Sequence, residues 1–340
     1  MVADPTPAVE RALNFPLPTV TSWEQWSRIF TDVATWAPAI REIGRRAALP
    51  VTTVKAGYPG TNAVFIVNAD SSDPTYVVKI YCPFCREDFT LERILHPLLM
   101  RYPDLPVPVS IGHGILKGEM DWPYLILSFL PGDAIRDVRP VIPRANLISI
   151  AHELGHCVKV LHRIPQSSRL PLEPLLGEWE ILAEQLLVKT LDDLTAKRIL
   201  SPELIRKIPD LVDSTLEDQA PSEPVLVNGD LTEDHVLVQE RDGTWHMSGL
   251  IDFADSLIAP RDYEWLALWF GALDQDPVAL RAFLHGYKAD FPIDETFRRR
   301  AMVFTFLHEF GALMIEMALQ KLGAPDVKSL KHLQTLLWSL

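Results

Sequence analysis

Asp230, His235 and Asp252 stand at the ends of apolar, β-branched runs within residues 225–252. Asp230 begins a short polar loop, His235 ends it, and an Asp-Gly turn at residues 242–243 then leads to Asp252. A hairpin closed by this turn brings the three side chains close together. One carboxylate can accept a proton from a hydroxyl while two further ligands hold a divalent metal, so the cluster suits phosphoryl transfer. The alternative is that both aspartates only satisfy backbone donors at strand ends.

A second candidate group lies earlier in the chain. Lys79 stands in an apolar run, V-V-K-I, where its charge needs a partner or a ligand if it points inward. Glu92, in the next helical stretch, is the candidate partner. Thr61 and Asn62 belong to the glycine-containing turn at residues 57–62, whose backbone N–H groups can cover phosphates. The order of glycine turn, lysine, glutamate and acidic hairpin favours a nucleotide site over a solvent-exposed lysine.

A zinc site is the rival catalytic centre. H-E-L-G-H, beginning at His152, matches a metallopeptidase motif in which His152 and His156 bind zinc and Glu153 acts as the base. His162 falls at the spacing of a third ligand, which requires the chain to leave the helix after His156. Lys159 replaces the glycine that permits this turn, and the helical apolar pattern continues beyond it. We therefore expect a continuous amphipathic helix and keep zinc as an alternative.

The C-P-F-C sequence from Cys82 to Cys85 is a candidate redox pair or half of a zinc site. A second pair is missing, and so are the glycine and tryptophan residues that flank redox motifs. We therefore expect two small apolar residues in a strand-to-helix turn. Three cysteines without a recognisable export signal predict a reducing, cytoplasmic location.

Length and composition indicate a globular protein with two lobes. A chain of 340 residues is too long for one compact core, and 48% hydrophobic with 23% charged residues is ordinary. No apolar run reaches the roughly 18 residues of a membrane-spanning helix, so we expect no membrane partner. The net charge of −13 argues against nucleic acid and suits a cationic small molecule. We expect a monomer or a homodimer.

Hydrophobic periodicity predicts a β-rich segment followed by a mainly helical one. A helix over residues 22–48, broken at Pro38, precedes the β-rich segment. The segment contains strands at 51–54, 63–67, 76–81, 107–115 and 123–130, with a helix at 86–100. Pro131-Gly132 ends it, and helices dominate from residue 145 except for the hairpin.

The acidic hairpin resembles a known family. V-N-G-D-L-T-E-D-H-V-L-V followed by G-L-I-D-F is similar to the H-G-D-x-x-x-x-N … I-D pattern of aminoglycoside phosphotransferases. W-P-Y-L-I-L-S-F-L-P-G (122–132) and L-I-S-I-A-H-E-L-G-H-C-V-K-V-L-H-R-I-P (147–165) resemble further family segments. F-T-F-L-H-E-F (304–310) resembles a late helix of the hygromycin phosphotransferases that modify the 7″-hydroxyl.

The resemblance implies an α+β, two-lobed, protein-kinase-like fold. A helical extension at residues 1–50 would precede a small, β-rich, nucleotide-binding N-lobe at 51–130. A larger, mainly helical C-lobe at 131–340 would carry the catalytic loop and the substrate-binding helices. Substrate specificity is expected in the last helices and in the helical insert near residues 165–220.

The resemblance also implies roles for matching residues. Asp230 is the catalytic carboxylate, Asp252 the main magnesium ligand, and His235 stands where the second metal ligand is usually asparagine. Lys79 holds the α- and β-phosphates and pairs with Glu92. The further implied residues are Thr61 and Asn62 under the phosphate-covering turn, the backbones of Ser128 and Leu130 at the adenine edge, and Glu264, with nearby Asp262 as the alternative, supporting the catalytic loop. Separately from the resemblance, the acidic side chains of Glu233, Asp234, Asp255 and Glu309 suggest a surface that faces a cationic substrate.

The chain departs from the family pattern twice. Asn228 replaces the usual histidine before Gly-Asp, a mainly structural position, so we expect activity to survive. His235 replaces asparagine, and its imidazole nitrogen is a softer donor than the oxygens that magnesium prefers. This change loosens one metal site or favours Mn²⁺.

These features predict an ATP-dependent kinase that transfers the γ-phosphoryl group to a hydroxyl, with Mg²⁺ as cofactor. The predicted substrate is an aminoglycoside or aminocyclitol such as hygromycin B, so the enzyme would confer antibiotic resistance. GTP is the alternative nucleotide. The alternative functions are a macrolide or other small-alcohol kinase, a zinc metallopeptidase acting through His152, Glu153 and His156, and a catalytically weak nucleotide-binding protein.

Overall fold

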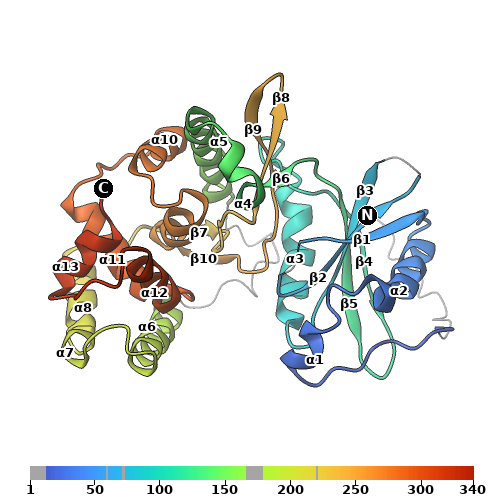
Figure 1. The fold of residues 1–340 in the computed structure, drawn as a ribbon, viewed down its shortest axis with the longest axis horizontal. Coiled ribbons are helices and arrows are strands. Elements are labelled where there is room, and N and C mark those ends of the chain that lie inside the picture. Colours follow the sequence, from blue (N-terminus) through green and yellow to red (C-terminus); the bar gives the residue numbers. More distant parts are fainter. Residues whose placement is uncertain (1–12, 59, 71–72, 166–178, 220) are drawn as a thin grey trace. The chain divides into compact units, whose positions relative to one another are not determined.

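The computed structural model describes residues 13–58, 60–70, 73–165, 179–219 and 221–340 (Figure 1). The chain divides into two compact units. The first comprises Met1–Pro97 and Pro108–Phe129, and the second comprises Leu98–Val107 and Leu130–Leu340. The first unit contains a five-stranded sheet and the second is mainly helical, which confirms the predicted α+β class.

The sheet of the first unit is antiparallel, with strand order β1-β2-β3-β5-β4. Alternating buried residues along β2 and β3 match the period of a strand packed against helices. The strands are β1 (Thr53–Ala56), β2 (Ala63–Asn68), β3 (Pro74–Ile80), β4 (Ser110–Leu116) and β5 (Trp122–Ser128).

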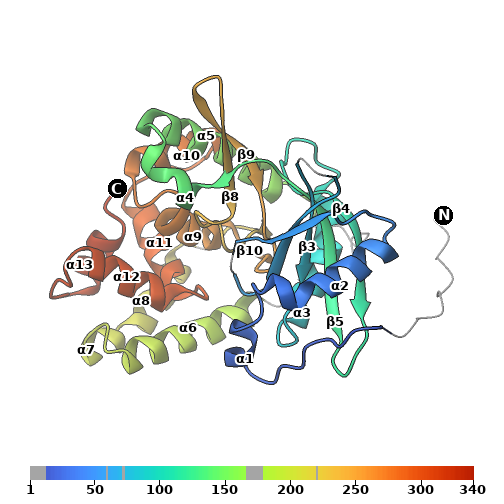
Figure 2. The same cartoon turned by 45° about the vertical axis from the view of Figure 1, so that its right-hand side comes forward.

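Helices cover both faces of this sheet (Figures 1 and 2). Trp26 of α1 (Trp23–Ser27) and Trp36 of α2 (Val33–Arg46) pack against Trp122 of β5, with ring centroids 5.6 and 4.8 Å from that of Trp122. Phe89 of α3 (Arg86–Leu99) packs on the other face, against Tyr81. Buried aromatic rings therefore fix both layers.

The predicted helix break at Pro38 is wrong. The chain breaks earlier, at Asp32, whose carboxylate accepts hydrogen bonds from the N–H groups of Ala34 and Thr35 and so begins α2. Pro38 lies inside α2, where it removes only one intrahelical hydrogen bond. The cap decides the boundary because it satisfies N–H groups that the first turn leaves unpaired.

The second unit combines helices with two small sheets. Strands β6 (Asp133–Ala134), β8 (Val236–Arg241) and β9 (Thr244–Leu250) form one sheet, and β7 (Pro224–Val227) pairs with β10 (Leu257–Pro260). The α-helices are α4 (Ile135–Val138), α5 (Arg144–His162), α6 (Trp179–Ala196), α7 (Pro202–Ile205), α8 (Ile208–Asp218), α9 (Trp265–Ala267), α10 (Pro277–Tyr287), α11 (Glu295–Phe306), α12 (Gly311–Lys321) and α13 (Leu330–Leu337). Within the described residues, no single helix has the length and apolarity needed to cross a membrane.

Helices α5 and α10 lie side by side (Figures 1 and 2). Their backbones touch at two glycines: a Cβ added at Gly155 would lie 2.0 Å from the Phe283 carbonyl oxygen, and one at Gly286 would lie 2.0 Å from the His152 carbonyl oxygen. Only glycine fits at these two positions. The close crossing fixes the C-terminal end of α5, which supports the site described next.

Candidate active site

The hairpin predicted around the acidic residues is present. Strands β8 and β9 pair with Val236 opposite Leu250, and their turn places Asp242 at φ 51° and Gly243 at φ 77°. Both angles are those of a two-residue turn with positive φ at its centre, which suits an Asp-Gly pair. The N–H of Ile251 donates to the His235 carbonyl at 3.0 Å, so the end of the polar loop lies beside the start of the Asp252 segment.

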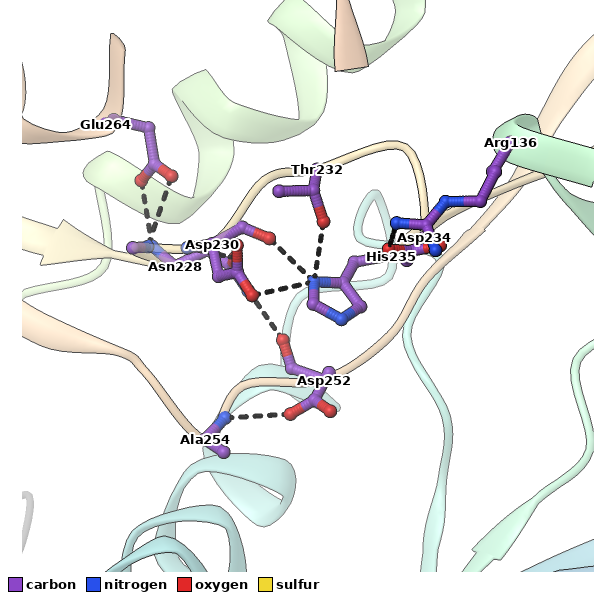
Figure 3. Close-up of polar contacts among 10 residues, drawn as sticks. Arg136, Asn228, Asp230, Thr232, Asp234, His235, Asp252, Ala254 and Glu264 are labelled. Atoms are coloured by element: carbon purple, nitrogen blue, oxygen red, sulfur yellow. Dashed lines mark hydrogen bonds and ion pairs between the residues drawn. The ribbon is translucent and has the colours of Figure 1, made fainter. Parts of the chain in front are cut away.

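Asp230 and His235 lie at the two ends of one tight loop (Figure 3). The His235 Nδ1 atom is 2.7 Å from the Asp230 backbone carbonyl and 3.5 Å from the Asp230 Oδ2 atom. Because a carbonyl only accepts, Nδ1 carries a proton and donates it to the Asp230 carbonyl. Burial raises the pKa of the Asp230 carboxyl; His235 opposes this shift and the charge of Asp252 adds to it.

Asn228 links the loop of Asp230 to that of Asp252. Its Oδ1 atom accepts the Asp230 N–H at 3.1 Å, and its Nδ2 donates to the Asp252 carbonyl at 2.8 Å (Figure 3). Asp252 has a φ of 59°, and its carboxylate accepts the Ala254 N–H at 3.2 Å. One buried amide therefore joins the two aspartate segments where the family pattern has an imidazole.

Glu264 contacts the start of the same loop (Figure 3). Its fully buried carboxylate accepts the N–H groups of Asn228 at 2.8 Å and Gly229 at 3.3 Å, and His162 Nε2 lies 3.4 Å away. Asp262, the other candidate for this role, pairs with Arg300 instead. The geometry therefore assigns the supporting position to Glu264.

In the first unit, Lys79 has the partner predicted for it. Its Nζ atom is 2.6 Å from Glu92 Oε2, with the two side chains 5% and 1% exposed. The Tyr81 hydroxyl donates to Glu92 at 2.5 Å, and His96 Nε2 lies 3.6 Å from the same carboxylate. Burial disfavours the charged carboxylate, but Lys79 and His96 hold the pKa of Glu92 below its usual range.

A family model described as the phosphotransferase enzyme family matches residues 56–302. The chain belongs to this family. The GDP and kanamycin complex of APH(2″)-IIia is similar in structure, with a TM-score of 0.63 and 19% identity, over 89% of this chain and 98% of that chain. ADP-bound APH(2″)-Ib has a TM-score of 0.56 and 16% identity, over 88% of this chain and 99% of that chain. Spectinomycin phosphotransferase APH(9)-Ia, in complex with ADP and spectinomycin, has a TM-score of 0.51 and 14% identity, over 88% of this chain and 93% of that chain. These likenesses confirm the kinase-like fold.

The H-E-L-G-H motif of this phosphotransferase is part of the continuous helix α5. The helix continues without a break to His162, which is buried and does not turn back toward His152 and His156. His152 and His156 are exposed, and Glu153 accepts the Met247 N–H of β9 at 2.8 Å. Among the described residues, no group of three or more His, Cys, Asp and Glu side chains is arranged to hold a metal by itself. The motif therefore anchors the hairpin to α5.

In the turn predicted to cover phosphates, the Asn62 side chain forms hydrogen bonds within the protein. Asn62 is 4% exposed; its Nδ2 donates to Asp88 at 2.9 Å and its Oδ1 accepts the Cys82 N–H at 3.0 Å. The amide thus ties the turn to the ends of β3 and α3 rather than facing a ligand. Thr61 is exposed, and Pro59 lies outside the described residues.

The Ser128 N–H, predicted to meet adenine, already donates to the Val109 carbonyl at 2.8 Å, and Ser128 Oγ accepts the Val109 N–H at 2.8 Å. The role of the Ser128 and Leu130 backbones at the adenine edge stays a prediction. Leu130 is half-buried. Cys82 is buried, and burial raises the pKa of its thiol, which disfavours the thiolate that redox chemistry with Cys85 requires.

Two of the carboxylates predicted to face a cationic substrate pair with an arginine of the phosphotransferase itself. Arg136 of α4 forms an ion pair with Asp234 (Figure 3). Its Nε lies 3.5 Å from Glu233 Oε1. Arg139 Nη2 lies 3.8 Å from the same glutamate. No local pattern indicates these contacts, because Arg136 and Asp234 are 98 residues apart.

Glu309 and Asp255 complete the predicted acidic set. Glu309 Oε1 is 3.5 Å from Lys189 Nζ, and Asp255 is exposed. The neighbouring His308, which sequence reasoning missed, is 1% exposed and stacks on Tyr263 with ring centroids 4.2 Å apart. Burial lowers the pKa of His308 to about 3, so this imidazole is neutral. The predicted specificity insert comprises α6 to α8, while residues 166–178 and 220 lie outside the described residues.

Proposed function

We propose that this phosphotransferase transfers the γ-phosphoryl group of a nucleoside triphosphate, ATP first, to a hydroxyl of a small molecule, with Asp230 as the catalytic carboxylate. The observation that carries the proposal is the loop that holds Asp230 and His235 at its two ends with Asp252 joined to it through Asn228. Because burial raises its pKa, the Asp230 carboxylate is a better proton acceptor than an exposed aspartate. It would orient the attacking hydroxyl and take its proton.

Asp252 and the Nε2 atom of His235 are the proposed ligands for a divalent cation. Magnesium binds through one or two carboxylates together with nucleotide phosphates and water, so a complete protein cage is not required. Asp252 offers the carboxylate oxygen that magnesium prefers, and the hydrogen bond at Nδ1 orients the His235 ring so that Nε2 would be the second, softer ligand. When bound, the cation would neutralise developing phosphate charge. Lys79, held by Glu92, is the proposed ligand of the α- and β-phosphates.

The proposed substrate is an aminoglycoside or aminocyclitol such as hygromycin B. Support comes from similar structures that hold kanamycin and spectinomycin and from the F-T-F-L-H-E-F segment that contains His308 and Glu309. Since some similar structures hold GDP and others ADP, ATP and GTP both belong in the assay. A macrolide or another small alcohol is the second candidate, favoured by His235 in place of asparagine.

The test measures ATP and GTP consumption and phosphorylated product against aminoglycosides, spectinomycin, macrolides and amino alcohols. Asp230→Asn is expected to lower kcat by about 10²- to 10⁴-fold, the usual contribution of general acid–base catalysis. Asp213→Asn, on the exposed face of α8, is the matched carboxylate-to-amide control and should keep wild-type kcat. Full activity of Asp230→Asn would disprove the assigned mechanism.

A further inference from the structure

The catalytic loop between Asp230 and His235 contains two adjacent acidic residues, Glu233 and Asp234. Arg136 contacts both side chains: its guanidinium pairs with Asp234 (Figure 3), and its Nε lies 3.5 Å from Glu233 Oε1. The Asp234 side chain is only 16% exposed, so its carboxylate needs the opposite charge of Arg136 nearby. Arg136 itself is 44% exposed, and solvent screening limits what the ion pair adds to global stability.

The backbone reinforces the same contact. The N–H of Arg136 donates to the Glu233 carbonyl at 3.2 Å. The preceding residues continue this pairing, since Asp133 lies opposite Val238 and Ala134 opposite Leu237 in the β6–β8 ladder. Residues 133–136 therefore form a strap that runs antiparallel to residues 233–238. The strap begins directly after Gly132, which has a φ of 131°.

The loop transmits any movement of Glu233 and Asp234 to both of its ends. The Thr232 N–H donates to the Asp230 carbonyl at 2.7 Å, and the His235 N–H donates to the Thr232 carbonyl at 3.2 Å. With His235 Nδ1 also bonded to the Asp230 carbonyl, the loop is a closed, hydrogen-bonded turn. These hydrogen bonds connect the Glu233–Asp234 side of the loop to both Asp230 and His235.

We propose that Arg136 is a positioning residue for phosphoryl transfer, which holds Asp230 and His235 in place by fastening Glu233 and Asp234 to the strap. This role rests on the proposed function of Asp230. It also changes the part that Glu233 and Asp234 play: they anchor the loop to the protein. Loss of Arg136 would leave a largely buried carboxylate unpaired within the catalytic loop.

The test compares Arg136→Met, Asp234→Arg and the charge-swapped double variant Arg136→Asp with Asp234→Arg. Arg144→Met is the matched control, because Arg144 forms a 3.1 Å ion pair with Asp276 in the same unit and is 67% exposed. Arg136→Met should lower kcat by about 10- to 100-fold with little change in the KM for nucleotide, since a misplacement of about 1 Å costs up to that much. The swap should recover most of the lost kcat.

Hydrogen exchange of the peptide spanning residues 230–236 provides a readout that needs no substrate. Arg136→Met should accelerate its exchange, while Arg144→Met should not, and the swap should restore protection. A kcat of Arg136→Met equal to that of Arg144→Met, or unchanged exchange in this peptide, would overturn the positioning role. Wild-type protein without phosphotransfer would instead refute the proposed function, and the exchange data would still decide whether Arg136 fastens the loop.

Discussion

The amide of Asn228 offers the sharpest test of how the two aspartate segments are held together. Asn228 is 1% exposed and makes one hydrogen bond to each segment, accepting from Asp230 N–H and donating to the Asp252 carbonyl. Asn228→Ala removes both bonds and leaves a buried donor and a buried acceptor without partners. Asn228→Asp keeps an acceptor for Asp230 but places a second oxygen against the Asp252 carbonyl.

The magnitudes follow from these contacts. A buried polar group that loses its partner costs about 1–3 kcal/mol, so Asn228→Ala, which leaves two such groups, should destabilise the second unit by about 2–6 kcal/mol. Since 1 kcal/mol shifts the Tm of a domain of this size by about 2–4 °C, the expected fall in Tm is about 4–24 °C. Displacement of the Asp230 carboxylate from its position should lower kcat by about 10- to 100-fold. Asn228→Asp should chiefly raise the KM for the metal–nucleotide complex, because only Asp252 is released.

The assay combines thermal unfolding with steady-state kinetics on the best substrate of the panel. Asn146→Ala, in the first turn of α5, controls for removal of an amide from the same unit. If Asn228→Ala and Asn146→Ala lose the same stability and activity, the bridging role of Asn228 is refuted. Equal effects of Asn228→Asp and Asn228→Ala on nucleotide KM would show that the two hydrogen bonds do not act separately.

Three further substitutions test other contacts. Glu92→Gln should destabilise the first unit by about 3–5 kcal/mol, because it leaves the Lys79 ammonium buried without its carboxylate, and unfolding curves measure this loss. Since folding lowers the pKa of Glu92, its contribution is present above about pH 4.5 and is lost as the pH falls; the wild-type Tm should drop more steeply than that of Glu92→Gln below this pH. His235→Asn should lower the affinity for Mn²⁺ relative to Mg²⁺, measured by titration of the nucleotide complex, because nitrogen donors favour Mn²⁺. Gly155→Ala should lower the Tm by several degrees, because its Cβ would lie 2.0 Å from the Phe283 carbonyl oxygen.

Sequence reasoning was most reliable where the deciding interactions are local. The Asp-Gly turn, the alternating strands and the continuous helix through His162 follow from residues within a few positions of each other. The break attributed to Pro38 failed because a capping aspartate six residues earlier satisfies the unpaired N–H groups. The proline and the capping aspartate are both local signals, but only the structure shows which of them sets the helix boundary.

Contacts between residues that are distant in the sequence could not be predicted. Glu233 and Asp234 were predicted to face a ligand, which stays a prediction, and the structure pairs both with Arg136, about a hundred residues earlier. The choice between Asp262 and Glu264 also depended on tertiary structure. Both residues lie on one short 3₁₀ turn, and only the folded chain shows that Glu264 accepts the Asn228 N–H. Hydrophobic period and motif spacing carry no information about such pairings.

The backbone contact between α5 and α10 has a consequence for engineering this enzyme. His162, at the end of α5, reaches Glu264 and also approaches the Tyr287 hydroxyl of α10 to 2.9 Å. Any residue larger than glycine at the crossing would push the two helices apart. The contacts of His162 with Glu264 and Tyr287 would shift as a result. Libraries that seek new substrates should therefore leave positions 155 and 286 constant and place their diversity in α6 and α12, whose exposed apolar residues tolerate change without reaching the support of Asp230.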